Sequence, residues 1–388
     1  MTVAQHNYDA AIVGAGPAGS WCAHQMARAG ARVVVIDGSH PREKPCGGGV
    51  TARALSLVGE QSGHQATTIK SASFGYGGRR ADIDLAAHHR GSRLDVVSRL
   101  EFDGRLLARA RTAGASVIAE RVTALDRAAG RWQLRTRTCT IAARWLVGAD
   151  GANSLVRRRV SRPFARADLS IACGYFIPGV CSTRIDIEFV AQPAGYIWAF
   201  PRPDHVAVGI GAQADEASTP ALMAIVDEWL RVHMPDAAGR RERYSWPIPS
   251  LTAASLQRET PVGDGWLLLG DAAGLVDPIT REGIFFALQS AEFAAASLTA
   301  NGETATAYAE RLRDEIYPEL LGAARLKARF FRPAFVNLLI HALHRSGRIR
   351  DVMADLVAGE QPYASLRARL LGTWELGLLW DLLRLQRT

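Results

Sequence analysis

Cysteine is scarce in this sequence, and the chain contains no long run of purely apolar residues. The 388 residues include five cysteines, at positions 22, 46, 139, 173 and 181, and no two of them form a C-x-x-C pair. This pattern argues against a disulfide framework or a zinc site, so we predict no metal and a reducing, cytoplasmic environment. The longest run without Asp, Glu, Lys or Arg, residues 10–27, is interrupted by glycines, a proline and polar residues, so we predict no membrane span, and the first residues lack the pattern of a signal peptide.

Acidic residues are outnumbered, and the excess of positive charge is concentrated at one end. The net charge is +8, and residues 325–388 hold eleven Arg and Lys but five Asp and Glu, a difference of six. This segment is also rich in Leu, Phe and Trp. It is either a solvated basic face of C-terminal helices, which we favour, or a peripheral contact with an anionic membrane surface. No motif for nucleic acid accompanies the charge, so we predict no nucleic-acid partner.

The first 37 residues carry the pattern of a dinucleotide-binding β-α-β unit. An apolar strand, Tyr8–Val13, leads into the GxGxxG turn Gly14-Ala-Gly16-Pro-Ala-Gly19; a helix and a second strand follow, ending at Asp37. The first glycine permits the turn, the second the close approach of a pyrophosphate, and the third the packing of helix on strand. The acid accepts a hydrogen bond from a ribose hydroxyl.

Two later motifs indicate that the dinucleotide is FAD. One apolar strand, at 145–148, runs into Asp150-Gly151; a second, at 266–269, delivers Gly270-Asp271 before a long helix that begins near Gly283. A helix N-terminus offers amide donors and positive potential to a phosphate or a flavin carbonyl, and Asp271 is placed to hold a ribityl hydroxyl. Because there is one dinucleotide motif, NAD(P)H or another electron donor would bind only transiently.

Four further segments resemble those of a known family. They are KPCGGGVTARALSLV from Lys44, SRLEFDGRLLARARTAGASV at 98–117, AGYIWAFPRPDHVAVGIG at 194–211 and VAGEQPYASLRARLL at 357–371. With the three flavin motifs they resemble the geranylgeranyl reductase group of the single-GxGxxG flavoproteins, whose fold is that of para-hydroxybenzoate hydroxylase. The resemblance covers nearly the whole chain.

The resemblance implies an α/β fold in three parts. A discontinuous Rossmann-like FAD-binding domain would comprise residues 1–66, 90–165 and 255–304. An inserted antiparallel β-sheet substrate domain would comprise 67–89 and 166–254, and a helical segment 305–388.

The resemblance also implies how the cofactor is held. Arg99 would lie near the FAD phosphates, Gly47–Gly49 would pass beside the isoalloxazine, and the backbone of Val122 would contact the adenine end. Together with the motifs above, the predicted cofactor-contacting residues are Gly14, Gly16, Ala18, Gly19, Asp37, Gly47, Gly48, Gly49, Arg99, Val122, Asp150, Asp271, Pro278, Gly283 and Ile284.

The chain departs from the group at one position of interest. Where the group usually has Pro-x-x-Gly-Glu-Gly, this chain has Pro278-Ile-Thr-Arg281-Glu-Gly283. The arginine would recruit an acidic or phosphorylated group, favour an anionic flavin, or simply point outward into solvent. Gly274 stands where aromatic hydroxylases of the wider family usually carry histidine, which argues against a phenol hydroxylase.

The segments between the flavin motifs predict a sheet over the flavin. Residues 67–85 form a hairpin pattern that turns at Gly75–Gly78, and three strands follow within 169–211. Tyr196, Trp198 and Phe200 alternate with small or aliphatic residues and share one face, either as plain core or, as we favour, as the wall of a site for a flat or apolar substrate. An apolar stripe in the tail (Leu371, Trp374, Leu378, Leu382 and Leu385) predicts a helix that is buried, or that docks on a partner, a lipid surface or a long apolar substrate.

Two enzymatic functions fit these residues, and a third class fits less well. The favoured one is a reductase that adds hydride from reduced FAD to one carbon of an isoprenoid double bond while an acid protonates the other. Cys46 is the candidate acid, unless it is a small apolar filler, and Tyr196, Trp198 and Arg281 complete the predicted catalytic set. The alternative is a monooxygenase acting on an aromatic, peptide-borne or carrier-tethered substrate. An electron-transfer protein would show a ferredoxin-like cysteine cluster, and none is present in the sequence.

Overall fold

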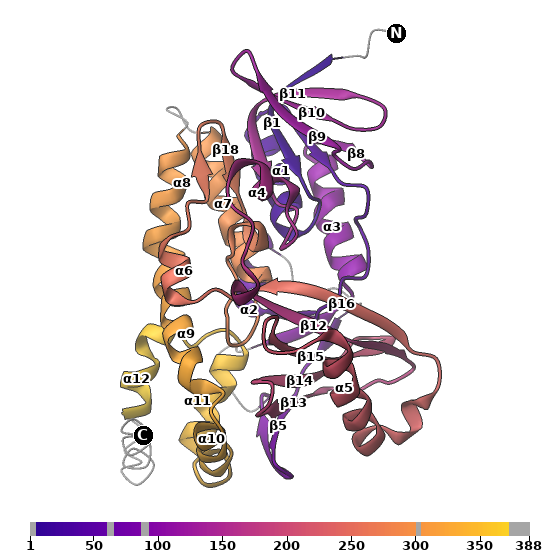
Figure 1. The fold of residues 1–388 in the computed structure, drawn as a ribbon, viewed down its shortest axis with the longest axis vertical. Helices are drawn as coiled ribbons and strands as arrows, with labels where there is room; N and C mark the ends of the chain where they lie inside the picture. Colours follow the sequence, from indigo (N-terminus) through magenta and orange to yellow (C-terminus); the bar gives the residue numbers. More distant parts are fainter. Residues whose placement is uncertain (1–4, 60–65, 87–92, 300–303, 372–388) are drawn as a thin grey trace.

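The computed structural model describes residues 5–59, 66–86, 93–299 and 304–371. Its first sheet contains the predicted β-α-β unit (Figure 1). Its strands run in the order β17-β18-β11-β1-β2-β8, and β10 and β9 continue from β11. The pairs along β18-β11-β1-β2-β8 are parallel, as an α/β dinucleotide fold requires. The bounds are β1 Gln5–Val13, β2 Val33–Ile36, β8 Ser116–Ile118, β9 Ala124–Ala128, β10 Arg131–Arg135, β11 Thr140–Gly148, β17 Val262–Gly263 and β18 Trp266–Leu268.

Helices α1, α3 and α7 enclose the core of this half. Helix α1 packs against both α3 and α7, and the four residues of β2 are all buried, as expected of a central parallel strand. The sequence predicts α1 from Ser20; the helix begins at Pro17, because proline suits the first turn of a helix. The helices here are α1 Pro17–Arg28, α2 Ala52–Val58, α3 Arg99–Thr112, α4 Leu155–Val160, α6 Ala253–Gln257, α7 Ile284–Thr299 and α8 Ala305–Arg311.

A second, seven-stranded sheet lies below the first in Figure 1. Its order is β16-β12-β15-β14-β13-β5-β6, so the hairpin at 67–85 and the strands of 169–211 join one sheet. The hairpin is confirmed, with its turn at Gly77-Gly78. The sheet is not wholly antiparallel, since β13 pairs with β5 in parallel. The bounds are β5 Ser71–Tyr76, β6 Arg79–Asp84, β12 Leu169–Pro178, β13 Arg184–Val190, β14 Gly195–Pro201, β15 His205–Gln213 and β16 Glu242–Pro249.

Helices cover both faces of the second sheet. Helix α5 (Thr219–His233) packs against β12 and β15, whereas α10 (Pro333–Arg345) packs against β5 and β6 (Figure 1). Phe74, Phe189, Phe330 and Met353 belong to the apolar core between the sheet and the C-terminal helices. The remaining elements are the small sheet β3 Gly49–Thr51, β7 Leu94–Val97 and β4 Ala66–Thr68, and the helices α9 Tyr317–Phe330, α11 Gly347–Val357 and α12 Tyr363–Leu371.

The predicted apolar stripe of the tail lies almost wholly beyond these elements. Helix α12 ends at Leu371, and Trp374, Leu378, Leu382 and Leu385 lie outside the described residues. Among the helices that the structure describes, none is long and apolar enough to cross a membrane.

Candidate functional site

Two glycines of the GxGxxG turn are required by close packing, and the third borders open space. Gly14 has φ +105°, and a Cβ there would lie 2.3 Å from the Ala149 carbonyl oxygen. A Cβ on Gly19 would lie 1.9 Å from the carbonyl oxygen of Gly14. Gly16 has φ −70°, which any residue can adopt, and the nearest atom to its Cβ position is His40 Nε2 at 3.8 Å. Because no side chain caps α1, the amides of its first turn, which includes Ala18, face this space.

Asp37 is held rigidly at the end of β2. Its Oδ2 accepts from the Ala15 amide at 2.9 Å and lies 2.9 Å from His40 Nδ1, and its Oδ1 accepts from the Ser39 amide at 2.7 Å. Burial alone would raise the pKa of this carboxyl, but the hydrogen bond and charge of His40 outweigh it and lower the pKa well below its usual range. Asp37 is therefore an anion at neutral pH. Val122 lies next to the loop that follows Asp37. The amide nitrogen of its neighbour Arg121 would be 3.1 Å from a Cβ on Gly38.

The predicted flavin residues later in the chain lie on the other side of this space. Asp271 pairs with Lys44, with Nζ and Oδ2 3.3 Å apart, and a Cβ on Gly283 would lie 3.2 Å from Asp271 Oδ1. Ile284 is the first residue of α7 and follows directly. The buried Pro278 lies in the loop that leads to α7.

The Asp150 carboxylate binds the N-terminus of helix α4. Its carboxylate accepts from the amides of Leu155 and Val156 and from the Ser154 hydroxyl, so it caps the N-terminus of α4. Burial raises the pKa of this carboxyl, and the bond from Ser154 opposes that effect.

The three consecutive glycines after Cys46 pack against the protein itself. A Cβ on Gly47 would lie 2.7 Å from the Phe200 ring, and one on Gly48, where φ is +80°, 2.6 Å from the Val97 carbonyl oxygen. A Cβ on Gly49 would lie 3.3 Å from the Phe200 ring. The side of Gly47 and Gly48 on which a Cβ would stand therefore faces protein atoms. All three glycines also line the cavity described below, and their place beside the isoalloxazine stays a prediction.

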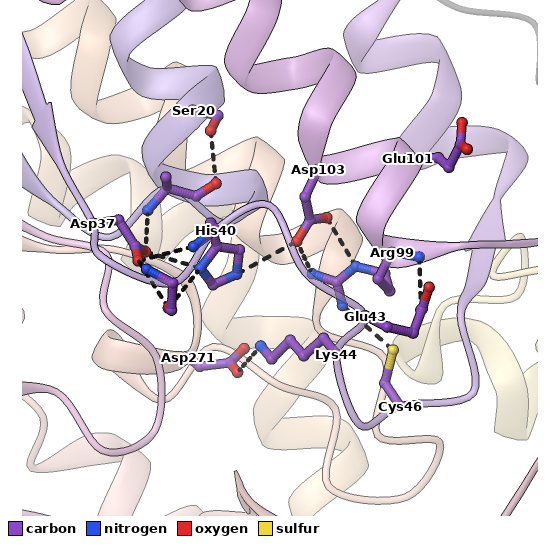
Figure 2. A network of polar contacts seen from close by, with 12 residues as sticks. Ser20, Asp37, His40, Glu43, Lys44, Cys46, Arg99, Glu101, Asp103 and Asp271 are labelled. Carbon is purple, nitrogen blue, oxygen red and sulfur yellow. Dashed lines mark hydrogen bonds and ion pairs between the residues drawn. The ribbon is translucent and has the colours of Figure 1, made fainter. Parts of the chain in front are cut away.

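A polar network reaches from Asp37 to Cys46 (Figure 2). Arg99 binds Asp103 through two bonds, Nε to Oδ1 at 2.9 Å and Nη2 to Oδ2 at 2.8 Å, and its Nη1 lies 3.4 Å from Cys46 Sγ. His40 Nε2 lies 3.7 Å from Asp103 Oδ2. Burial disfavours the charge of Arg99, but Asp103 overcomes this and raises the pKa of the guanidinium above its ordinary value. Cys46 is thus fixed in place by a permanently charged, nearly fully buried arginine.

One mainly apolar cavity joins the flavin motifs to the second sheet. Near α1 and α7 it is lined by Pro17, Cys46, Asp271 and Gly283. Tyr196, Trp198 and Phe200 line it from β14, which confirms that the three aromatics share one face. The rest of its lining includes apolar side chains of the sheet and of α9 and α11, namely Phe74, Ile185, Ile187, Phe189, Phe330, Met353, Leu356 and Val357.

Two predicted catalytic residues, Tyr196 and Arg281, meet at the wall of this cavity. The Tyr196 hydroxyl donates to the Thr280 carbonyl at 2.7 Å, which ties β14 to the loop before α7. Burial raises the pKa of this phenol, and the charge of Arg281 opposes the rise. The Arg281 guanidinium lies over the Tyr196 ring, 4.7 Å from its centroid, so the alternative of an outward-pointing side chain is wrong.

The residues present fit FAD. The open space beside Gly16, the uncapped amides of α1 and the buried His40 Nε2, which has no hydrogen-bond partner among the described residues, are suited to a pyrophosphate. Asp37 and Asp271 are suited to hydroxyl groups, and the cavity continues past Cys46 and Gly283, where an isoalloxazine would extend.

Residues 7–313 match the model of a family described as "FAD binding domain". The chain belongs to this FAD-binding family. It is 30% identical to menaquinone reductase of Mycolicibacterium smegmatis, over 91% of this chain and 92% of that protein. It is 29% identical to digeranylgeranylglycerophospholipid reductase of Methanothrix thermoacetophila, over 86% of this chain and 91% of that protein. The resemblance to the geranylgeranyl reductase group is thereby confirmed, and the protein is an FAD-dependent oxidoreductase of that type.

Solved structures confirm the fold of this flavoprotein. A geranylgeranyl bacteriochlorophyll reductase-like protein from Thermoplasma acidophilum superposes with a TM-score of 0.78 at 22% identity, covering 95% of this chain and all of that one. A flavin-dependent brominase and a p-nitrophenol 4-monooxygenase share the fold too, so the fold alone does not separate reduction from oxygenation.

Some residues of the site have contacts that no motif specifies. Lys44 and Asp103 stand within the segments quoted above and His40 outside them, but their contacts with Asp271, Arg99 and Asp37 appear only in the structure. Helix α11 also contributes Met353, Leu356 and Val357 to the cavity lining. Their spacing of three and four residues predicts an apolar helix face, but not that the face borders a cavity.

Proposed function

We propose that this flavoprotein reduces carbon–carbon double bonds of an isoprenoid or similarly apolar chain. The observation that carries the proposal is one cavity whose lining combines residues of the FAD motifs, Cys46, the aromatic face of β14 and apolar side chains of α9 and α11. An extended hydrocarbon chain would bury its surface there, at about 25 cal/mol for each Å² removed from water. The names of two relatives, menaquinone reductase and digeranylgeranylglycerophospholipid reductase, support the same substrate class.

The two halves of the cavity would divide the work. Residues in 1–66, 90–165 and 255–304 would hold FAD, with the pyrophosphate at the N-terminus of α1 and the flavin end between the Cys46 loop and α7. Residues in 67–89 and 166–254 would hold the substrate against β14. When reduced by NAD(P)H or another donor, FAD supplies the hydride.

The chain itself would supply orientation, a dry site and a proton. Cys46 is the proton donor in this proposal, because its thiol lines the cavity and Arg99 fixes its position. Trp198 and Phe200 would pack on the substrate, and Tyr196 would act mainly by holding the loop before α7. The aromatic and apolar walls exclude water from the reacting atoms.

The test is an analysis of product mass. FAD-loaded protein is incubated with geranylgeraniol or a geranylgeranyl ester and a reductant, first without and then with oxygen, and the product is examined by mass spectrometry. Gain of two hydrogen atoms per double bond without oxygen supports the proposal. Gain of an oxygen atom, seen only in air, would establish the monooxygenase instead. A Leu356→Trp variant, which places a larger side chain at the cavity wall, should lose the long substrate but still reduce a shorter one.

A further inference from the structure

Arg281 adopts a backbone conformation that is unfavourable for an arginine. Its φ is +60°, in the left-handed region, and Ala129 is the only other non-glycine residue with positive φ in the described ranges. A non-glycine residue persists there only when its surroundings hold it, and such residues cluster at functional sites. Its amide donates to the Asp277 carbonyl at 2.9 Å, which fixes the turn.

The side chain of Arg281 occupies a slot formed by three other elements. It lies over the Tyr196 ring of β14, with Phe331 beside it at 6.0 Å, and its Nη2 donates to the Gly211 carbonyl of β15 at 3.0 Å. Gly211 makes room for it, since a Cβ there would lie 2.8 Å from Arg281 Nε. The guanidinium is therefore positioned at the wall of the cavity by its neighbours.

The charge of this guanidinium is not neutralised by the part of the chain that the structure describes. Nε and Nη1 are buried without a hydrogen-bond partner, and no carboxylate of the described ranges lies within ion-pair distance. The neighbouring carboxylates are engaged elsewhere: Asp277 accepts from the Ile279 and Thr280 amides and the Tyr363 hydroxyl, and Glu282 pairs with Arg53.

A second cation stands close to the first. Lys327 of α9 donates to Gln213 Oε1 and Ser250 Oγ, both at 2.7 Å, and so reaches the same end of β15. Burial and the charge of Arg281 lower the pKa of Lys327 from 10.5 to about 8. Arg281, unlike Lys327, lines the apolar cavity, and because its guanidinium is bound only to a neutral oxygen, it favours a negative ligand group there.

We propose that Arg281 binds an anionic oxygen group, a carboxylate or a phosphate ester, at the head of a substrate whose apolar chain fills the cavity. Nη1, which no described residue engages, can donate charge-assisted hydrogen bonds to the oxygens of such a group. Arg281 is in this account a specificity-determining residue rather than the acid of the reaction. The inference rests on the proposed function for the identity of the substrate's apolar chain, but its test measures binding and does not require double-bond reduction.

Binding of matched ligands tests the inference without turnover. Geranylgeraniol, geranylgeranoic acid and geranylgeranyl monophosphate have the same chain and differ in the head. Dissociation constants for the FAD-loaded full-length protein are taken from the quenching of tryptophan fluorescence, since Trp198 and Trp246 line the cavity. The wild type should bind the acid or the phosphate about tenfold to a hundredfold more tightly than the alcohol, and the preferred head identifies the anion.

Three variants make the assignment specific. Arg281→Gly suits the φ of +60°. It should bring the ratio of the dissociation constants of the alcohol and the preferred anionic ligand close to one, with the affinity for the alcohol little changed. Gly211→Ala keeps the arginine but displaces it, and should lower the ratio as well. Arg135→Gln removes one positive charge from an exposed ion pair with Asp126 and should leave the ratio as in the wild type.

An unchanged ratio in Arg281→Gly would overturn the inference, as would a wild type with no preference for an anionic head. A shifted flavin spectrum in Arg281→Gly together with an unchanged ratio would assign the arginine to the flavin and likewise overturn it. If the ratio depends on Arg281 while no double bond is reduced, the proposed function fails and this inference stands. If double bonds are reduced and the ratio does not depend on Arg281, only this inference fails.

Discussion

Replacing Gly16 with alanine should leave the stability of the cofactor-free fold almost unchanged and still weaken FAD binding. The φ of −70° suits alanine, and the Cβ position meets no atom closer than His40 Nε2 at 3.8 Å. Alanine is a poorer N-cap than glycine by about 0.5–1 kcal/mol, and it lowers the entropy of the unfolded chain by a similar amount. The two effects offset each other, so we expect a change in the free energy of unfolding within about 0.5 kcal/mol.

Gly14→Ala provides the contrast. It combines a φ of +105° with a Cβ only 2.3 Å from the Ala149 carbonyl oxygen, so the backbone must move. We expect a loss of about 3 kcal/mol or more in the free energy of unfolding. For Gly16→Ala the new methyl group instead enters the space assigned to the pyrophosphate, which should raise the dissociation constant of FAD at least about tenfold.

Both quantities can be measured on the same preparations. Urea unfolding of FAD-stripped protein, followed by circular dichroism, gives the free energies, and titration with quenching of FAD fluorescence gives the affinities. If Gly16→Ala binds FAD like the wild type, the pyrophosphate does not lie against Gly16. If Gly14→Ala unfolds at the same urea concentration as the wild type, the close contact with Ala149 is not rigid.

Three further predictions concern single side chains. Cys46→Ser, with Arg99 intact, should keep its FAD but lose about a hundredfold in turnover if the thiol delivers the proton; unchanged turnover in product assays would exclude that role. The folded chain releases the proton of Lys327 near pH 8 and the unfolded chain near pH 10.5, so the free energy of unfolding should rise over this interval, and titration of Lys327→Met should lack the rise. Arg157 and Glu259 form a buried ion pair at 2.7 Å, and Glu259→Gln should cost about 3 kcal/mol in urea unfolding, whereas a value near zero would show that the pair contributes little.

Local patterns predicted the parts of the fold in which neighbours in sequence are neighbours in space. The β-α-β unit, the hairpin of β5 and β6 and the shared face of Tyr196 and Trp198 follow from periodicity and glycine placement. The parallel pairing of β13 with β5 joins segments more than a hundred residues apart, and no local pattern specifies such a register.

The candidate site likewise combines features that local patterns predict with features that appear only in the folded chain. Gly14 and Gly19 have the turn and packing roles that their motif predicts, whereas the role of Asp37 toward a ribose hydroxyl stays a prediction. The sequence did not show that Gly47 faces Phe200, or that Arg281 points into the cavity rather than into solvent. Both depend on which distant side chains fill the neighbouring space, and packing of that kind is settled only when the whole chain is folded.

The most direct test of the reductase account is a single turnover without oxygen. The bound FAD is reduced under anaerobic conditions, excess reductant is removed, and a polyprenyl substrate is added while the flavin absorbance is followed. The account predicts that the absorbance of oxidised flavin returns with the substrate alone, in proportion to the double bonds consumed. Flavin that stays reduced with each polyprenyl substrate, and is reoxidised only when oxygen enters, would contradict it.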